Sequence, residues 1–356
     1  MKLNAATPWW ALTWPALACV ILIMWIVVGA PGPLAAAAGF VLIATVFGAV
    51  YHAEVVAHRV GEPFGTLILA LAVTIIEVAL IVSIMVKGGA DTAELARDTV
   101  FAAVMIVCNG IVGLCLLFGG MRHHTQGFHL QGANTALSVL IALTTLSLVL
   151  PNVTASTAGQ TFSSAQLVFA GLVSLVLYGS FVFVQTIRHR DFFLAPEETH
   201  AAPPTNQTTL VSAGLLLVSL VAVVGLAKML TPSLERGIEA AGAPKSLVGV
   251  IIAALVLLPE GLAAFRAARL NRLQTSMNLA LGSVLASIGL TIPAVAAVSI
   301  ALGKPLTLGL NPKEEVFLAL TLIVSVSTLA TGRTTVMQGI VHVVIFAAFL
   351  FLVVVP

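Results

Sequence analysis

Two glutamates stand inside apolar segments that are long enough to cross a membrane. Glu77 lies in the run 67–82 and Glu260 in the run 248–264, and neither run contains a lysine or an arginine. Placing a carboxylate near the middle of a membrane-spanning helix costs about 3 kcal/mol on insertion scales. Because a chain seldom carries such a cost twice without a use for it, the two acids indicate a path for a cation or for protons.

Polar side chains that could act as oxygen ligands accompany both acids. Thr74 lies three residues before Glu77, on the same helix face. The spans that follow each acid are rich in small and polar residues, with Asn109 in one and Ser283 and Ser287 in the other. Small residues let helices approach closely, and amides or hydroxyls supply oxygen atoms. Each hydroxyl could instead bond a carbonyl of its own helix.

A proline next to the second acid adds a possible backbone ligand. Pro259 precedes Glu260 and has no N–H, so the carbonyl of Leu255 loses its helical donor. Irregular backbone of this kind is tolerated at membrane depth where it lines a cavity. A freed carbonyl near a carboxylate predicts an oxygen-rich site.

A site made of oxygen ligands selects hard cations. Two carboxylates with hydroxyls and carbonyls suit Ca²⁺, and could also hold Na⁺ or K⁺. No cysteine or histidine lies next to either glutamate, which argues against zinc or copper. In a low-dielectric site without a cation, both acids should hold protons, which the cation would displace. Occupancy by cation or by protons, but not by both, is what an exchanger needs.

Other titratable residues are candidates for proton access or regulation. His52, Glu54 and His58 lie near the end of the second apolar span, and Asp98 begins the fourth. Histidine titrates near neutral pH, although solvated positions at the membrane interface explain these residues equally well. His342 is in the last span, and we expect it to lie away from the glutamates.

The composition indicates an all-α polytopic membrane protein. Hydrophobic residues make up 59% of the chain and charged residues only 8%, and the mean hydropathy is +1.10. Soluble domains carry roughly a quarter charged residues, so this chain could not cover a water-facing surface. The net charge of +2 gives no indication of nucleic-acid binding. An odd count of cysteines, all in apolar runs, argues against a disulfide framework.

Hydropathy and turn residues predict about eleven transmembrane helices. The polar segment 189–207 divides the chain, which suggests an extra first helix at 1–33 and two five-helix repeats at 34–188 and 208–356. Since each repeat has an odd number of spans, the two would be inverted in the membrane. The expected spans are 9–29, 34–57, 64–87, 98–120, 133–151, 163–187, 208–230, 246–267, 277–302, 313–331 and 335–355.

Lysine and arginine positions predict the orientation. With the N-terminus inside, nine of these residues fall on the cytoplasmic side and seven on the other. The three arginines at 266, 269 and 272 beside a short loop give the firmest local signal. We therefore expect a cytoplasmic N-terminus, a cytoplasmic linker at 189–207 and an external C-terminus.

Five stretches of the sequence resemble a known family. They are similar to bacterial ChaA-type calcium/proton antiporters, in the cation/proton exchanger branch of the calcium/cation antiporter superfamily. The resemblance covers nearly the whole chain after the first span. The matching stretches are 52–69, 75–80 (Ile75-Ile-Glu-Val-Ala-Leu80), 258–262 (Leu258-Pro-Glu-Gly-Leu262), 277–286 and 327–335.

The resemblance implies a fold, an activity and a site. The fold would have eleven spans in inverted repeats, with spans 2 and 7 as gating helices. One essential acid per repeat corresponds to Glu77 and Glu260, with Asn109, Ser283 and Ser287 on the helices that they face. Such a protein would exchange cytoplasmic Ca²⁺ for external protons by alternating access across the bacterial inner membrane, without a cofactor. Relatives often carry an acidic stretch between the halves, which is reduced here to two glutamates at 197 and 198.

Three alternatives remain open from the sequence. Members of this type are also credited with sodium/proton and potassium/proton exchange, so the same site could serve a monovalent cation. A passive channel would show flux that does not depend on a pH gradient. An intramembrane enzyme is more remote, because there is no His-Glu-x-x-His motif and no lysine in register with Ser283. The sequence leaves the oligomeric state open.

Overall fold

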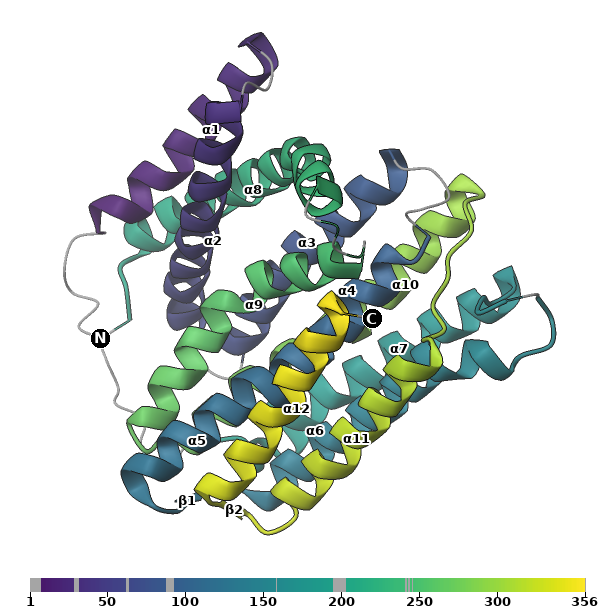
Figure 1. The fold of residues 1–356 in the computed structure, drawn as a ribbon. Coiled ribbons are helices and arrows are strands. Elements are labelled where there is room, and N and C mark those ends of the chain that lie inside the picture. Colours follow the sequence, from purple (N-terminus) through teal and green to yellow (C-terminus); the bar gives the residue numbers. More distant parts are fainter. Residues whose placement is uncertain are drawn as a thin grey trace. The chain divides into compact units, whose positions relative to one another are not determined.

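The chain is almost entirely helical, with one short pair of strands (Figure 1). The computed structural model describes residues 8–28, 32–61, 64–87, 93–157, 159–194, 203–240, 242, 244 and 246–355. Residues 1–7 and Pro356, whose sides of the membrane were predicted, lie outside the described residues. The linker positions 195–202, with their two glutamates, also lie outside them. The described helices group into two compact units, one with residues from 1–84 and 197–242 and one with residues from 85–196 and 243–356.

Unit one contains the first helices of the chain and one long helix from its middle. The helix α2 packs against α1 and α8. Helices α1 and α8 also touch, and a glycine allows their close approach, because a Cβ at Gly225 of α8 would come within 2.9 Å of the Leu22 side chain of α1. An edge-to-face contact between Trp10 and Tyr51 joins α1 to α2. Its elements are α1 (Trp9–Val28), α2 (Gly32–Val60), most of α3 (Phe64–Lys87) and α8 (Asn206–Ala240).

Unit two contains the remaining helices, and Leu95–His123 is the most buried of its candidate membrane spans. Helix α10 packs against α7, α9 and α6, and α12 runs alongside α5 (Figure 1). Strands β1 and β2 pair antiparallel, so they join the end of α5 to the start of α12. Its elements are α4 (Leu95–Met105), η2 (Ile106–Ile111), α5 (Val112–His123), β1 (Gln126–Gly127), α6 (Leu130–Thr144), η3 (Thr145–Val149), η4 (Leu150–Val153), α7 (Ser164–Phe183), η5 (Val184–Arg188), η6 (Arg190–Phe192), α9 (Ser246–Arg269), α10 (Leu273–Leu302), α11 (Pro312–Leu329), β2 (Arg333–Thr334) and α12 (Val336–Val354).

Each of the eleven predicted spans coincides with a helical stretch of the described chain. Within that part of the chain, nine helices are long and apolar enough to cross a membrane. Helix α3 contributes a shorter apolar stretch, Leu71–Val86, and α11 begins with the charged residues Lys313, Glu314 and Glu315. The fold class, an all-α polytopic membrane protein, is therefore confirmed. The division into inverted repeats stays a prediction, and each compact unit draws helices from both predicted repeats.

Local signals explain several helix starts. The side chains of Ser163, Asn311 and Thr335 form capping boxes with residues three positions later, at the starts of α7, α11 and α12. Pro259 and Pro293 lie inside α9 and α10 without ending them. Prolines inside membrane helices are tolerated because neighbouring groups can satisfy the freed carbonyls.

Glycines bring α12 very close to α5. A Cβ at Gly113 would lie 2.9 Å from the Cβ of His342, and one at Gly120 would lie 2.8 Å from the backbone nitrogen of Val336. On the other side, a Cβ at Gly339 would lie 2.3 Å from the backbone nitrogen of Leu117. Small residues permit this close approach of two membrane helices. The contact matters for function because it carries a histidine into the centre of unit two.

Candidate ion-binding site

Unit two gathers five of the predicted site residues on three mutually packed segments. Glu260 is buried in α9, with 5% of its surface exposed. Its neighbour Gly261 lies against η2, because a Cβ there would be 3.0 Å from the Cδ1 of Ile111. Helix α10 packs against both α9 and η2. The residues that these segments contribute are Leu255 and Glu260 from α9, Asn109 from η2, and Ser283 and Ser287 from α10.

The other predicted acid lies in unit one. Glu77 and Thr74 are both buried in α3, with 3% and 4% of their surfaces exposed. Each of the two units therefore holds one buried carboxylate of the predicted pair. Within the described part of the chain, no three side chains of the histidine, cysteine, aspartate or glutamate type lie close enough to hold one metal ion.

Asn109 lies on a π-helical turn between α4 and α5. Residues Ile106–Ile111 form this turn, which inserts one extra residue into a single helical span. An inserted residue rotates the following side chains by about 100° around the helix axis. From the α-helical repeat alone, the sequence predicts one shared face for Asp98, Ala102, Met105, Asn109 and Gly113. In the structure Asp98 lies against Gly249 of α9, whereas Gly113 faces α12.

The Asn109 amide is hydrogen-bonded at both ends. Its Nδ2 donates to Thr321 Oγ1 of α11 at 2.8 Å, and its Oδ1 lies 3.0 Å from His342 Nδ1 of α12. The other ring nitrogen, His342 Nε2, lies 3.0 Å from Thr328 Oγ1 of α11. Met105 places its sulfur 3.4 Å from the Thr321 hydroxyl. Asn109 is fully buried and His342 is only 1% exposed, so this cluster is closed to water.

One neutral tautomer of His342 satisfies the whole cluster. Because the Asn109 oxygen can only accept, the ring must donate from Nδ1. Nε2 is then an acceptor for the Thr328 hydroxyl. Hydrogen positions are assigned from this network. We call these four residues, Asn109, Thr321, Thr328 and His342, the amide cluster. Sequence reasoning set His342 aside, although an ionisable residue in a 19-residue apolar helix is a signal that could have found it.

Asp98 belongs to a charged group at the start of α4. Arg97 contacts Asp98 Oδ1 through Nε at 2.9 Å and through NH2 at 2.8 Å, and NH2 also reaches Glu94 Oε2 at 3.0 Å. The same guanidinium donates to the carbonyl of Gly309 at 3.3 Å and to Gln160 Oε1 at 3.4 Å. The role of Asp98 as a proton-access residue stays a prediction.

The three titratable residues of α2 differ in their surroundings. His52 is fully buried, and its Nε2 lies 2.9 Å from the carbonyl oxygen of Ala11 in α1. Glu54 is exposed and His58 is half-buried. The structure therefore gives His52 a clear packing role between α1 and α2. A part for any of them in proton access stays a prediction.

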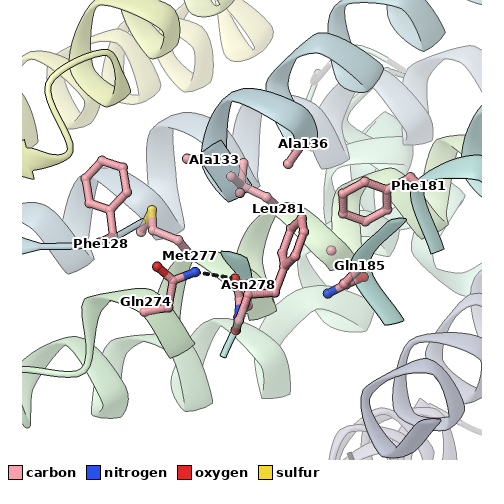
Figure 2. Close-up of a pocket in the computed structure, with 12 residues that line it drawn as sticks. Phe128, Ala133, Ala136, Phe181, Gln185, Gln274, Met277, Asn278 and Leu281 are labelled. Carbon is pink, nitrogen blue, oxygen red and sulfur yellow. Dashed lines mark hydrogen bonds between the residues drawn. The ribbon is translucent and has the colours of Figure 1, made fainter. Parts of the chain in front are cut away.

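A pocket opens where the start of the central linker crosses α10 (Figure 2). Asn278 Nδ2 donates to the carbonyl of Phe193 at 2.5 Å, and Gln274 Nε2 donates to Asn278 Oδ1 at 2.8 Å. Gln274 Oε1 in turn accepts from the backbone N–H of His129 at 2.6 Å. Aromatic rings from Phe128, Phe181 and Phe193 line the pocket. None of the predicted site residues lines this pocket, although Gly282, the neighbour of Ser283, does.

Comparisons with known proteins agree with the arrangement. A model of the sodium/calcium exchanger protein family matches residues 31–187 and 211–355. The chain is 51% identical over 360 residues to the putative ionic transporter y4hA of Sinorhizobium fredii, covering 99% of this chain and 98% of that protein. It is 37% identical over 353 residues to the sodium-potassium/proton antiporter ChaA of Escherichia coli, covering 96% of this chain and 94% of that protein.

Solved structures share the fold at low sequence identity. Native YfkE superposes with a TM-score of 0.77 at 16% identity, covering 97% of this chain and 100% of that chain. A crystal structure of the H⁺/Ca²⁺ exchanger CAX gives a TM-score of 0.72 at 16% identity, covering 96% of this chain and 88% of that chain.

Proposed function

The chain belongs to the sodium/calcium exchanger protein family, whose members are transporters and not enzymes, and on that premise we propose that it exchanges cytoplasmic Ca²⁺ for external protons. The observation that carries the proposal is the burial of one carboxylate in each unit, at 3% exposure for Glu77 and 5% for Glu260. An acid buried at membrane depth in a transporter indicates the ion path.

In the proposed mechanism the two acids hold either protons or a cation. Low dielectric favours the protonated acids, and an arriving cation replaces those protons. Neutral oxygens from Asn109, Ser283 and Ser287, with the carbonyl of Leu255 and Thr74, would complete the shell around the ion. Ca²⁺ takes 6–8 oxygens at 2.3–2.6 Å in flexible geometry, whereas Mg²⁺ requires a tighter octahedron and dehydrates reluctantly. Mg²⁺ should therefore be a poor substrate.

Alternating access would deliver the site to each side in turn. The N-terminus and the linker 189–207 would be cytoplasmic and the C-terminus external, in the bacterial inner membrane. A repeat with an odd number of spans supports this inverted arrangement. A cysteine placed at Thr205 should be labelled from the cytoplasmic side, and one placed at Val153, which is separated from it by one span, from the external side. The reverse pattern, or labelling of both from the same side, would contradict the orientation.

A second candidate is exchange of Na⁺ or K⁺ for protons by the same acids. It is favoured by the 37% identity to the Escherichia coli sodium-potassium/proton antiporter. A monovalent ion would need only one carboxylate to lose its proton, whereas a divalent ion would displace up to two. The pH dependence of transport therefore separates the two substrates.

The test is ion exchange in proteoliposomes with an imposed pH gradient. We expect the apparent Ca²⁺ affinity to weaken up to about 100-fold per pH unit on acidification, as two displaced protons require. Na⁺ and K⁺, measured in the same vesicles, should weaken by at most about tenfold per pH unit. A Ca²⁺ affinity that is indifferent to pH would contradict proton competition. Strong Na⁺ or K⁺ exchange without Ca²⁺ exchange would replace the substrate and leave the mechanism standing.

A further inference from the structure

The amide of Asn109 is held at both ends by side chains from α11 and α12. An exchange of its oxygen and nitrogen would require the imidazole of His342 to move its proton from Nδ1 to Nε2 and the Thr321 hydroxyl to become the donor. The present orientation satisfies both ends at 3.0 Å and 2.8 Å. Losing the ring or the hydroxyl would leave a buried polar group of the amide without a partner, which costs free energy. With Nδ1 as the donor, His342 and Thr321 therefore hold the plane of the amide, and with it the direction of the second lone pair on Asn109 Oδ1.

Two backbone features allow the contact between Asn109 and His342. Gly113 lies one turn after Asn109, and a side chain there would occupy the space of the His342 Cβ, 2.9 Å away. The π-helical turn presents Asn109 towards the same two helices. Both features occur at one level of the helix pair, and π-helical turns of this kind are frequent at functional sites. A histidine on α12 thus reaches a residue 233 positions earlier in the chain.

We propose that His342 is a positioning residue, which acts through Asn109 to fix the direction of an oxygen ligand of the transported cation. The inference rests on the proposed function, in which Asn109 supplies a neutral oxygen to the ion. Thr328 supports the ring from its far side, and Thr321 holds the amide nitrogen. A ligand held by its own hydrogen bonds loses less freedom when the ion binds, so its orientation contributes to affinity rather than to turnover.

Two amide substitutions at position 342 divide the contacts of the ring. An asparagine side chain places its NH₂ group where Nδ1 stands in histidine, so His342→Asn keeps the bond to Asn109. A glutamine side chain reaches further, to the place of Nε2, so His342→Gln keeps only the bond to Thr328. If His342 merely filled space, glutamine would be the better replacement, because it is closer to histidine in size. The two ideas therefore predict opposite orders.

The experiment measures initial rates of Ca²⁺, Na⁺ and K⁺ exchange against cation concentration in proteoliposomes. We expect His342→Leu and His342→Gln to raise the half-saturating cation concentration about five- to tenfold, as loss of one hydrogen bond implies, with the maximal rate within twofold of wild type. His342→Asn should stay within about twofold of wild type. The matched control is Thr144→Val, because Thr144 is also fully buried but its hydroxyl bonds the Leu140 carbonyl of its own helix.

Each outcome has one meaning. Thermal melting in detergent shows whether the variants fold. If His342→Leu does not fold, the comparison of His342→Asn with His342→Gln still decides whether His342 positions Asn109. If glutamine preserves affinity and asparagine does not, or if all three variants bind cations as wild type does, the positioning role is wrong. If wild-type vesicles exchange none of the three cations, the proposed function fails and this inference falls with it.

Discussion

Two polar clusters lie on the same helical segment, Leu95–His123, and they differ in charge. The group at its beginning is ionic, with Arg97 between Asp98 and Glu94. The amide cluster, near its middle, is made of neutral hydrogen-bonding groups. A charge in the middle of a span costs several kcal/mol unless it is paired or functional. This segment therefore has neutral groups in its middle and its ion pairs at its beginning.

The two clusters also bind different parts of unit two together. Arg97 reaches the carbonyl of Gly309 in the loop before α11, and Asn152 donates to Leu310 of the same loop at 2.5 Å. These bonds join the start of α4 and the turn η4 to one loop. The amide cluster joins three helical segments inside the unit. Glu260 is a carboxylate in the middle of a further span, α9. We therefore expect changes in the middle to alter transport and changes at the ends to alter stability.

The largest expected effect is at the two buried acids. Glu77→Gln and Glu260→Gln should each abolish cation/proton exchange while the protein remains folded, because glutamine fills nearly the same volume but releases no proton. Exchange is measured as cation-dependent proton release in proteoliposomes, and folding by thermal melting in detergent. The control is Glu94→Gln, at the end of the segment, which should exchange at the wild-type rate. Wild-type exchange by either buried-acid variant would remove that residue from the site.

The next effect should be on stability. Arg97→Met removes the partner of Asp98, whose side chain is 11% exposed, and should destabilise the protein by about 3 kcal/mol. Adding Asp98→Asn should recover most of that loss, because the double variant leaves no buried charge alone. Removing Glu94, which is 58% exposed, should cost less than about 0.5 kcal/mol.

Unfolding in detergent gives the stabilities, and exchange per folded molecule gives the function. The double variant should exchange within about twofold of wild type. Loss of exchange in a stable double variant would instead support the prediction that Asp98 is a proton-access residue.

Hydropathy predicted the spans well because it is a local property. A membrane helix must satisfy its backbone internally and be about 20 residues long, so length and composition alone locate it. The buried acids could be predicted for the same reason, because the free-energy cost of a carboxylate in an apolar span depends only on the sequence of that span. Side-chain partners could not be read in this way. The contact between Asn109 and His342 joins residues 233 positions apart.

The π-helical turn shows a second limit of the sequence. The residues Ile106–Ile111 are compatible with an ordinary α-helix, and in the structure this turn packs against α9, α10, α11 and α12. The predicted face, from Asp98 to Gly113, follows the α-helical repeat, which the inserted residue interrupts. The prediction therefore placed Asn109 on a polar face, without identifying α11 and α12 as its neighbours.

The smallest effect should come from the end of α10, where side chains hold the first part of the linker. Asn278→Leu removes the donor to the Phe193 carbonyl at the pocket of Figure 2. Loss of one such bond costs about 1 kcal/mol, which should speed local opening of 189–194 about fivefold. Hydrogen exchange of this segment, followed by mass spectrometry, measures that rate.

Gln185→Leu is the matched control, because Gln185 lines the same pocket from η5. We expect Gln185→Leu to leave the opening rate of 189–194 at its wild-type value, and both variants to transport cations at the wild-type rate. A fall in cation transport with Asn278→Leu alone would mean that a polar group at the end of a span also acts in transport. That result would contradict the distinction between the two clusters.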